Sequence, residues 1–217
     1  MINGKTESRI FRTFSRSPGS HRVLLLNPAL RHAGRFSKWV DLGCGSAEAT
    51  RTVRVPKTIE RVSVDVYDGP DKPAGFINAD IRDHVDKTAL TGCLVTLLDV
   101  IEHFERDQGR EFLHTLERKA DSVCIFTPDG FYRQDAESHS ETAQRPEQWH
   151  RSGWTPEEFS EWGYDVIRFP RLHSNFGGFA AIRSTYWNNR RKWERSIERL
   201  HIAGLLDYYA SRLHLKK

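Results

Sequence analysis

The stretch "WVDLGCGSAEATR", Trp39–Arg51, decides the fold of this chain. It begins with an apolar step, continues through Asp41 and the glycines Gly43 and Gly45, and ends in residues that favour a helix. A strand that turns at glycines into a helix is where open α/β sheets bind nucleotide-like ligands. The question is then which ligand this turn holds.

The residues around the turn distinguish two kinds of ligand. A dinucleotide site has a third glycine near the start of the helix, where this chain has Ala47. Asp41, at the end of the strand, is a poor neighbour for a phosphate and a good one for a positive charge. S-adenosylmethionine carries a sulfonium and an ammonium group, so the turn favours this cofactor.

The rest of the chain alternates apolar runs with helical patterns, which is typical of a parallel sheet. Strands are expected at 38–44, 61–68, 75–81, 93–101 and 122–128. Helices are expected at 21–33, 47–55 and 106–120, with another beginning at Thr155 as N-cap and Pro156 as first residue. The segments 164–170 and 178–187 flank a Gly-Gly turn region and predict a terminal antiparallel pair. The expected fold class is α/β, a Rossmann-like, mostly parallel sheet with helices on both faces.

Length and composition fit a single domain. The 217 residues are 38% hydrophobic and 11% aromatic, with a formal net charge of +4. We expect an N-terminal helical segment (1–36), a Rossmann-like core (37–187) and a basic C-terminal helix (188–217). The chain is long enough for one sizeable core, and no second hydrophobic unit is expected.

Cysteine spacing and hydropathy predict the compartment. Cys44, Cys93 and Cys124 show no paired metal spacing, which predicts reduced thiols. The sequence shows neither a secretion signal nor an apolar run of about 18 residues, so we expect a cytoplasmic protein without a transmembrane segment.

Two further acids follow the next expected strands. Asp65 comes about 20 residues after the glycine turn, at the position from which a carboxylate binds paired ribose hydroxyls. Asp65 alone would fit NAD equally well. Asp80 follows the third strand, where it can accept a hydrogen bond from an adenine amino group while Ile81 covers the ring.

Four motifs stand in order between Lys38 and Trp187, namely "DLGCGS", "VDVYD", "NADI" and "LLDVIEHF". Together they resemble the class I S-adenosylmethionine-dependent methyltransferases. The resemblance implies a seven-stranded sheet whose last strand is antiparallel, with the cofactor over the carboxyl ends of the first four strands. The residues expected to bind it are Asp41, Gly43, Cys44, Gly45, Asp65, Asp80, Ile81 and Asp99.

Two histidines are candidates for the chemistry. His103 closes "DVIEH" just past the fourth strand, and His150 lies in the long loop 129–153 after the fifth. Strands four and five lie side by side in such a fold, so this loop can bring His150 over "DVIEH". Either histidine can act as the base that removes the acceptor's proton. Alternatively, a divalent cation such as Mg²⁺ is bound by Asp99, Glu102, His103 and His150.

The acceptor is suggested only by resemblance. "DVIEH", "TPDG" and "H..GWT..EF..WGY" are similar to the methyltransferases that modify the terminal 2′-hydroxyl of small RNAs, where two acids and two histidines bind magnesium. The first acid here is Asp99 where that group has glutamate. "EH" also resembles the ubiquinone-pathway O-methyltransferases, and "TPDGF" with "HRSGWTPEEF" resembles bacterial small-molecule and glycan-cluster methyltransferases. We expect O-methylation of a small-molecule or glycan hydroxyl, with RNA 2′-O-methylation and a non-catalytic cofactor-binding subunit as alternatives.

The C-terminal part is basic. Residues 183–217 hold nine Lys or Arg against three Asp or Glu. Such an excess fits either a nucleic-acid surface or a solvated helix, and we favour the helix because none of its faces is exclusively basic. A homodimer through this helix is a further possibility, although the sequence shows no heptad seam.

Overall fold

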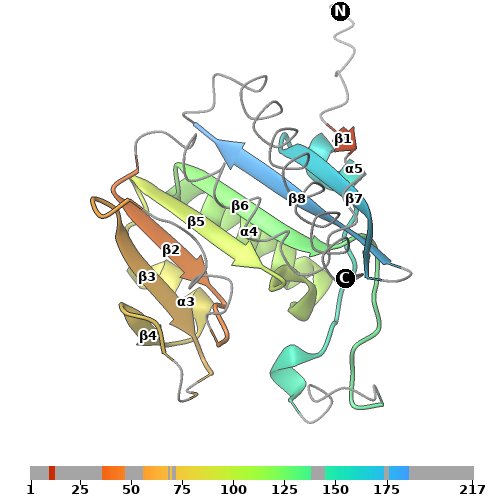
Figure 1. Ribbon diagram of the computed structural model, residues 1–217, viewed down its shortest axis with the longest axis horizontal. Helices are drawn as coiled ribbons and strands as arrows, with labels where there is room; N and C mark the ends of the chain where they lie inside the picture. Colours follow the sequence, from red (N-terminus) through yellow and green to blue (C-terminus); the bar gives the residue numbers. More distant parts are fainter. Residues whose placement is uncertain are drawn as a thin grey trace, which may run out of the picture.

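Eight strands form one sheet in the computed structural model, which describes residues 10–12, 36–46, 56–67, 69, 72–137, 145–173 and 176–185. The strands are β1 (Ile10–Arg12), β2 (Lys38–Leu42), β3 (Glu60–Asp65), β4 (Phe76–Asn78), β5 (Cys93–Leu98), β6 (Ser122–Pro128), β7 (Asp165–His173) and β8 (Phe176–Ser184). Their order is β1-β7-β8-β6-β5-β2-β3-β4 (Figure 1). Within this sheet β8 runs antiparallel to β6 and β7, and every other neighbouring pair is parallel. The predicted fold class is therefore confirmed.

Alternating side chains on the central strands explain the sheet. In β2, Val40 and Leu42 point to one face, and their register partners Val95 and Leu97 of β5 point the same way. All four side chains are at most 1% exposed and belong to one apolar core. Every residue of β5 is buried, as expected for a strand covered on both faces.

The structure adds an edge strand to the seven that were expected. β1 lies in the segment 1–36 that we predicted to be helical, and it pairs in parallel with β7, Ile10 opposite Val166. An uncovered edge of the nine-residue strand β7 would leave backbone N–H and C=O groups unpaired, and β1 pairs part of that edge. The helix expected at 21–33 lies outside the described residues.

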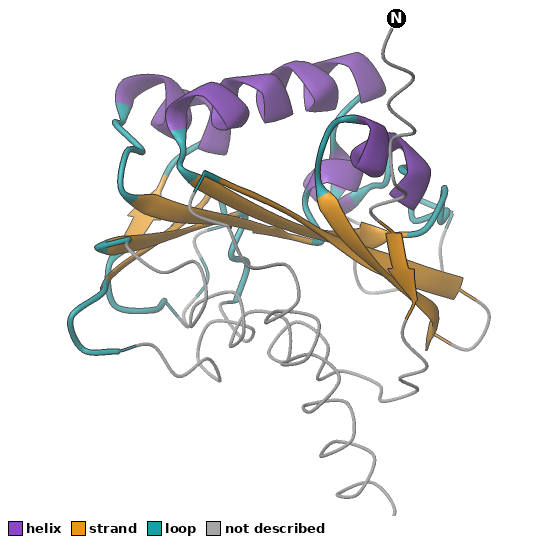
Figure 2. Cartoon of the chain, turned by 90° about the horizontal axis from the view of Figure 1, so that it is seen from above, coloured by secondary structure: helices purple, strands orange, loops and turns teal. Residues whose placement is uncertain are grey.

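Three described helices cover one face of the sheet (Figure 2). They are α3 (Ile81–Lys87), α4 (Arg106–Lys119) and α5 (Pro156–Glu161). In α4 the buried residues Gly109, Phe112, Leu113 and Leu116 follow the helical period. The helices expected at 47–55 and 188–217 lie outside the described residues. None of the described helices is long and apolar enough to span a membrane.

Local sequence signals set the ends of two helices. Thr155 is the N-cap of α5 as predicted, and it forms a capping box that was not predicted: the Thr155 side chain accepts from the backbone N–H of Glu158, and the Glu158 carboxylate accepts from that of Thr155. At α3 the prediction was wrong, because the strand expected at 75–81 ends at Asn78. Asp80 instead caps a helix that begins at Ile81, and its side chain accepts from the Arg82 backbone N–H.

Candidate active site

The glycine turn after β2 lies between the carboxyl ends of β3 and β5. Gly43 has a φ of +73°, and its backbone N–H donates to the carbonyl of Val64 at 2.8 Å. A Cβ at Gly43 would stand 2.5 Å from Cγ2 of Val100, which follows β5. The turn therefore needs glycine both for its backbone angle and for the close approach of Val100.

Asp65 joins this turn to the end of β3. Its Oδ2 accepts a 2.7 Å hydrogen bond from the Gly45 N–H, and its Oδ1 accepts one of 2.7 Å from the Tyr67 N–H. The carboxylate is buried, and each oxygen retains a lone pair for another donor. Asp65 thus holds together the glycine turn and the segment that follows β3, and its binding of ribose hydroxyls stays a prediction.

Cys44 lies between the predicted cofactor acids. Burial, followed by the negative charges of Asp41 and Asp65, raises the pKa of its thiol to about 12. The thiol is therefore neutral at physiological pH and is not a nucleophile. Its expected contribution to a cofactor site is limited to the backbone and shape of the turn.

Asp41 sits in a buried chain of hydrogen bonds. Trp39 Nε1 donates to Thr96 Oγ1 at 2.9 Å, and Thr96 Oγ1 donates to Asp41 Oδ1 at 2.6 Å. The indole can only donate, so the Thr96 hydroxyl must accept from it and turn its own proton toward the carboxylate. The chain crosses from β2 to β5 and fixes the orientation of the Asp41 side chain.

Asp80 and Ile81 occupy the first turn of α3 rather than a strand end. Both oxygens of Asp80 accept from the guanidinium of Arg82, at 3.0 and 2.5 Å, and hydrogen bonding with Arg82 lowers the pKa of the carboxyl. Ile81 packs partly against the core. The predicted adenine contacts of these two residues remain predictions, and Arg82 would compete for the Asp80 carboxylate.

Three of the four predicted metal ligands come together just past β5. One donor atom from each of Glu102, His103 and His150 lies within 4.8 Å of the others. Glu102 and His103 belong to the short 3-10 helix η1 (Ile101–His103). Asp99 is not part of this group; it has a φ of +53°, the only positive φ outside glycine among the described residues. The left-handed residue and the following 3-10 turn direct the chain sharply after β5.

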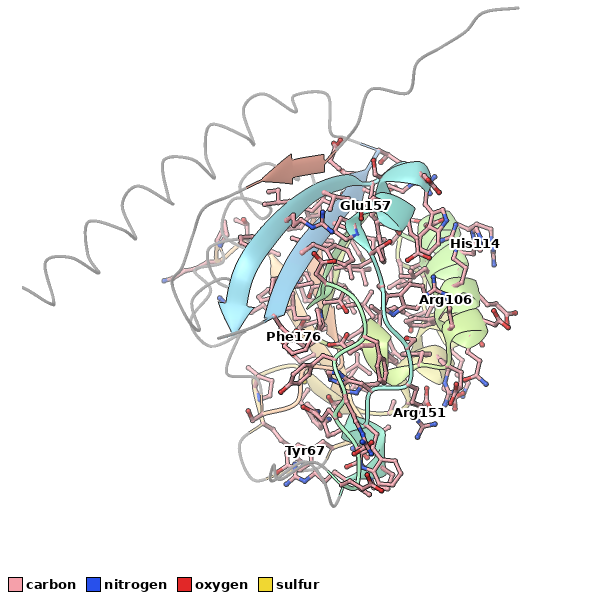
Figure 3. The ribbon with its side chains drawn as sticks, turned by 90° about the vertical axis from the view of Figure 1, so that its right-hand side faces the viewer. Tyr67, Arg106, His114, Arg151, Glu157 and Phe176 are labelled. Atoms are coloured by element: carbon pink, nitrogen blue, oxygen red, sulfur yellow. The ribbon has the colours of Figure 1, made fainter. Side chains whose placement is uncertain are left out.

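Loop 129–153 brings His150 to this group. The backbone N–H groups of Arg151 and Ser152 donate to the carbonyl of Glu102, at 2.8 and 3.1 Å, and the imidazoles of His103 and His150 lie 5.0 Å apart. The strand order predicted this approach. Figure 3 shows Arg151 and Tyr67 toward one end of the molecule, while His114 lies on the outer side of α4.

Backbone carbonyls orient both imidazoles. His103 Nδ1 lies 3.2 Å from the carbonyl oxygen of Trp149, and His150 Nδ1 lies 2.7 Å from that of Tyr132. A carbonyl can only accept, so each Nδ1 carries the proton and each Nε2 keeps a lone pair. Sequence reasoning missed these partners because a carbonyl contact leaves no mark on residue type.

Burial keeps both histidines neutral. It lowers the pKa of His103 below its ordinary value, and together with the nearby His103 it lowers the pKa of His150 to about 4. The third member, Glu102, is 2% exposed, and its Oε2 accepts from Thr127 Oγ1 at 3.0 Å. Two neutral imidazoles and a buried carboxyl group form a nitrogen and oxygen donor set suited to a divalent cation.

Sequence reasoning also missed the contact between the 129–153 loop and the cofactor side. The guanidinium of Arg145 lies 4.9 Å from the ring centre of Tyr67, within the range of a cation–π interaction. Arg145 precedes the 3-10 helix η3 (Pro146–Gln148), which lies in this loop. Tyr67 follows Asp65 by two residues, so the loop reaches from the histidines to the expected ribose position.

Comparison with known proteins finds similarity in structure only. No protein-family model matches the chain, and no curated protein matches its sequence. The methyltransferase domain of a bacterial Hen1 protein, CtHen1-CN, is 19% identical with a TM-score of 0.50, over 75% of this chain and 97% of that one. The plantazolicin methyltransferase BamL is 14% identical with a TM-score of 0.50, over 88% of this chain and 77% of that one.

The small RNA methyltransferase HEN1 is also similar, at 19% identity and a TM-score of 0.48 over 75% of this chain. The matched part spans a quarter of the length of that protein. The two matches at a TM-score of 0.50 are both to methyltransferases and show a shared fold. The chain has the fold of the class I S-adenosylmethionine-dependent methyltransferases.

Proposed function

We propose that this protein is an S-adenosylmethionine-dependent O-methyltransferase that holds a divalent cation between Glu102, His103 and His150. The observation that carries the proposal is the meeting of these three donors within 4.8 Å, next to the glycine turn at the carboxyl edge of the sheet. BamL, which shares the fold, was solved with S-adenosylhomocysteine. The cofactor is assigned to the turn at Gly43–Gly45 and to Asp41 and Asp65.

The pKa values favour metal ligation over general-base catalysis. A base works best when its pKa lies near the operating pH, whereas the pKa of His150 is lowered to about 4. A metal ligand benefits from the same shift, because no proton has to be displaced from the imidazole at neutral pH. A bound divalent cation lowers the pKa of a coordinated hydroxyl, which supplies the activation that the histidines lack.

The donor set also bears on which cation is bound. Mg²⁺ prefers oxygen ligands, whereas imidazole nitrogen suits first-row transition ions. With two histidines and one described carboxyl group, the site should prefer Mn²⁺, Co²⁺ or Zn²⁺ to Mg²⁺. The sequence suggested Mg²⁺ or another divalent cation, and this donor set favours the transition ions among these.

Other residues of the chain orient the three proposed metal ligands. Trp149 and Tyr132 fix the tautomers of the two imidazoles through their carbonyls, and Thr127 orients the Glu102 carboxyl group. Orientation of ligands by such partners commonly changes metal affinity by about 10- to 100-fold. The acceptor that we propose is a small-molecule or glycan hydroxyl placed at this group.

The test of the proposal measures metal binding and methyl transfer separately. Titration calorimetry with Mn²⁺ should show one site in the wild type, and His103→Ala or His150→Ala should weaken it by about 100-fold. His114→Ala, which removes an exposed histidine on α4, is the matched control and should change nothing. S-adenosylhomocysteine affinity should stay within about twofold in all variants. Retention of full Mn²⁺ affinity by both site variants would overturn the metal assignment.

RNA is the second candidate acceptor because two exposed arginines border the site. Arg151 is close enough to His103 for its charge to contribute to the lowered pKa, and Arg145 covers Tyr67. Methyl transfer to a short RNA and to a neutral glycan or phenol should therefore be compared at several salt concentrations. If RNA is the acceptor, Arg151→Ala together with Arg145→Ala should weaken RNA binding and reduce its salt dependence. An unchanged salt dependence would remove this candidate.

A further inference from the structure

Two half-exposed aromatic rings lie beside the histidine pair of the candidate active site. Tyr132 is 39% exposed and Phe176 is 38% exposed, and their rings meet edge to face with centres 4.7 Å apart. Tyr132 follows β6 in the chain. Phe176, labelled in Figure 3, is the first residue of β8. Because β8 runs antiparallel to β6, with Pro128 opposite Gly178, its first residue lies at the carboxyl edge of the parallel strands.

Tyr132 contacts His150, one of the three residues of the proposed metal site (Glu102, His103 and His150), through both its backbone and its ring. Its carbonyl accepts from Nδ1 of His150, and its ring centre lies 5.8 Å from that of His150. The next ring, that of His103, lies 5.0 Å from His150. A continuous row of rings therefore runs from Phe176 through Tyr132 and the two histidines toward Glu102.

These two aromatics differ from those of the core. Phe159 and Phe179 also meet edge to face, with ring centres 5.2 Å apart, but both are fully buried. The core pair is explained by the apolar area that it buries. The pair Tyr132 and Phe176 leaves more than a third of each side chain in solvent beside a row of titratable groups, which is the pattern of a ligand-binding wall.

The charged side chains that follow Tyr132 in the chain are paired with one another. Arg133, the next residue in the chain, forms ion pairs with both Asp135 and Glu137. Two acids against one base leave this segment without a spare positive charge for a phosphate. The rings of Tyr132 and Phe176 meet edge to face. This arrangement suits a flat aromatic ligand, which binds by offset stacking on one ring and by edge contact with the other.

We propose that Tyr132 and Phe176 form an acceptor subsite for a flat, uncharged aromatic ring whose hydroxyl group reaches Glu102, His103 and His150. The inference rests on the proposed function and names its acceptor as a phenolic compound. Stacked rings are separated by about 4.5 to 7 Å between centres. The ring of Tyr132 itself lies 5.8 Å from that of His150, so a ligand ring that packs beside Tyr132 is close enough for a hydroxyl substituent to approach the imidazole.

Two diols of matched shape test the subsite. Catechol carries two neighbouring hydroxyls on an aromatic ring, and cis-1,2-cyclohexanediol carries them on a saturated one. Binding of each is measured calorimetrically with Mn²⁺ present, both with and without S-adenosylhomocysteine. The wild type should bind catechol more tightly, and Tyr132→Ala should weaken catechol by about fivefold while leaving the saturated diol within about twofold.

The variants separate stacking from a merely structural role. Tyr132→Ala keeps the carbonyl that holds His150, so its Mn²⁺ affinity should be unchanged. Phe176→Leu should also weaken the binding of catechol selectively. The control is Phe131→Leu, which changes the residue before Tyr132, 55% exposed, and should have no effect on catechol binding. Equal loss of both diols, or no preference of the wild type for catechol, overturns the subsite. A wild type that binds no S-adenosylhomocysteine refutes the proposed function instead, and the preference measured without cofactor still decides the subsite.

Discussion

Replacing Thr96 by valine tests whether the buried chain through Trp39 and Asp41 serves the cofactor. Valine has nearly the shape of threonine but can neither accept from Trp39 Nε1 nor donate to Asp41 Oδ1. All three side chains are at most 3% exposed, so water cannot readily replace the lost hydrogen bonds. The variant therefore leaves one buried donor and one buried acceptor each short of a partner.

The size of the effect follows from the two bonds. A neutral hydrogen bond contributes about 1 kcal/mol and one to a charged group about 1.5 to 3 kcal/mol, so Thr96→Val should lower the free energy of unfolding by about 3 kcal/mol. Domains of this kind have about 5 to 15 kcal/mol, so the variant should still fold. Thr96→Ser keeps both bonds and loses one methyl group, at a cost of about 1 kcal/mol.

Paired ligands distinguish a cofactor role from a structural one. S-adenosylhomocysteine carries the amino group that we assign to Asp41, and 5′-methylthioadenosine lacks the whole amino-acid part. Thr96→Val should weaken the first by about tenfold and the second by less than about twofold, while Thr96→Ser should bind both normally. Equal weakening of the two ligands, or an unfolding free energy unchanged by Thr96→Val, would refute this reasoning.

Three other predictions follow from the described contacts. Gly43→Ala should destabilise the fold by about 2 kcal/mol or more, because of its φ of +73° and the overlap with Val100, and Val100→Ala should relieve only part of the loss in chemical unfolding. Burial lowers the pKa of His150 in the folded state to about 4, so its contribution to stability is present above the unfolded value near 6.5 and is lost as pH falls toward 4. The difference in free energy of unfolding between wild type and His150→Asn should therefore change only between about pH 6.5 and 4. A difference that stays constant from pH 7 to 4 would contradict the burial argument. Tyr164→Phe removes the buried hydroxyl that donates to the Glu117 carboxylate and should cost about 2 kcal/mol in thermal unfolding without any change in metal or cofactor affinity.

Sequence patterns predicted the elements whose signal is local or periodic. β6 has the predicted bounds, and α5 begins with the predicted Thr155 and Pro156. The approach of His103 and His150 was also predictable, since it requires only that β5 and β6 be neighbours. Patterns of residue type predict this much because apolar periodicity and caps act within a few residues of where they are read.

The parts that were missed depend on contacts without a residue signature. Asp80 could belong to a strand end or a helix cap, and the Arg82 N–H and guanidinium decide for the cap. The three-residue strand β1 pairs with the edge of β7. Nothing in the residue types of Ile10–Arg12 predicts this pairing, because it depends on the free edge of a strand far away in the sequence. Asp99 has a positive φ, which no residue pattern around it indicates, and its predicted part in metal and cofactor binding stays a prediction.

The way Glu102, His103 and His150 are held would separate the proposed metal binding from the choice of acceptor. His103 and His150 are oriented by the carbonyls of Trp149 and Tyr132, and the carbonyl of Glu102 is bound by backbone N–H groups of the 129–153 loop. Backbone contacts survive side-chain substitution when the loop keeps its path. The side chains at the same positions are then free to contact the acceptor, and Tyr132 serves both purposes through different atoms. A change of ring at position 132 should therefore alter which acceptor binds without dismantling the group that would activate it.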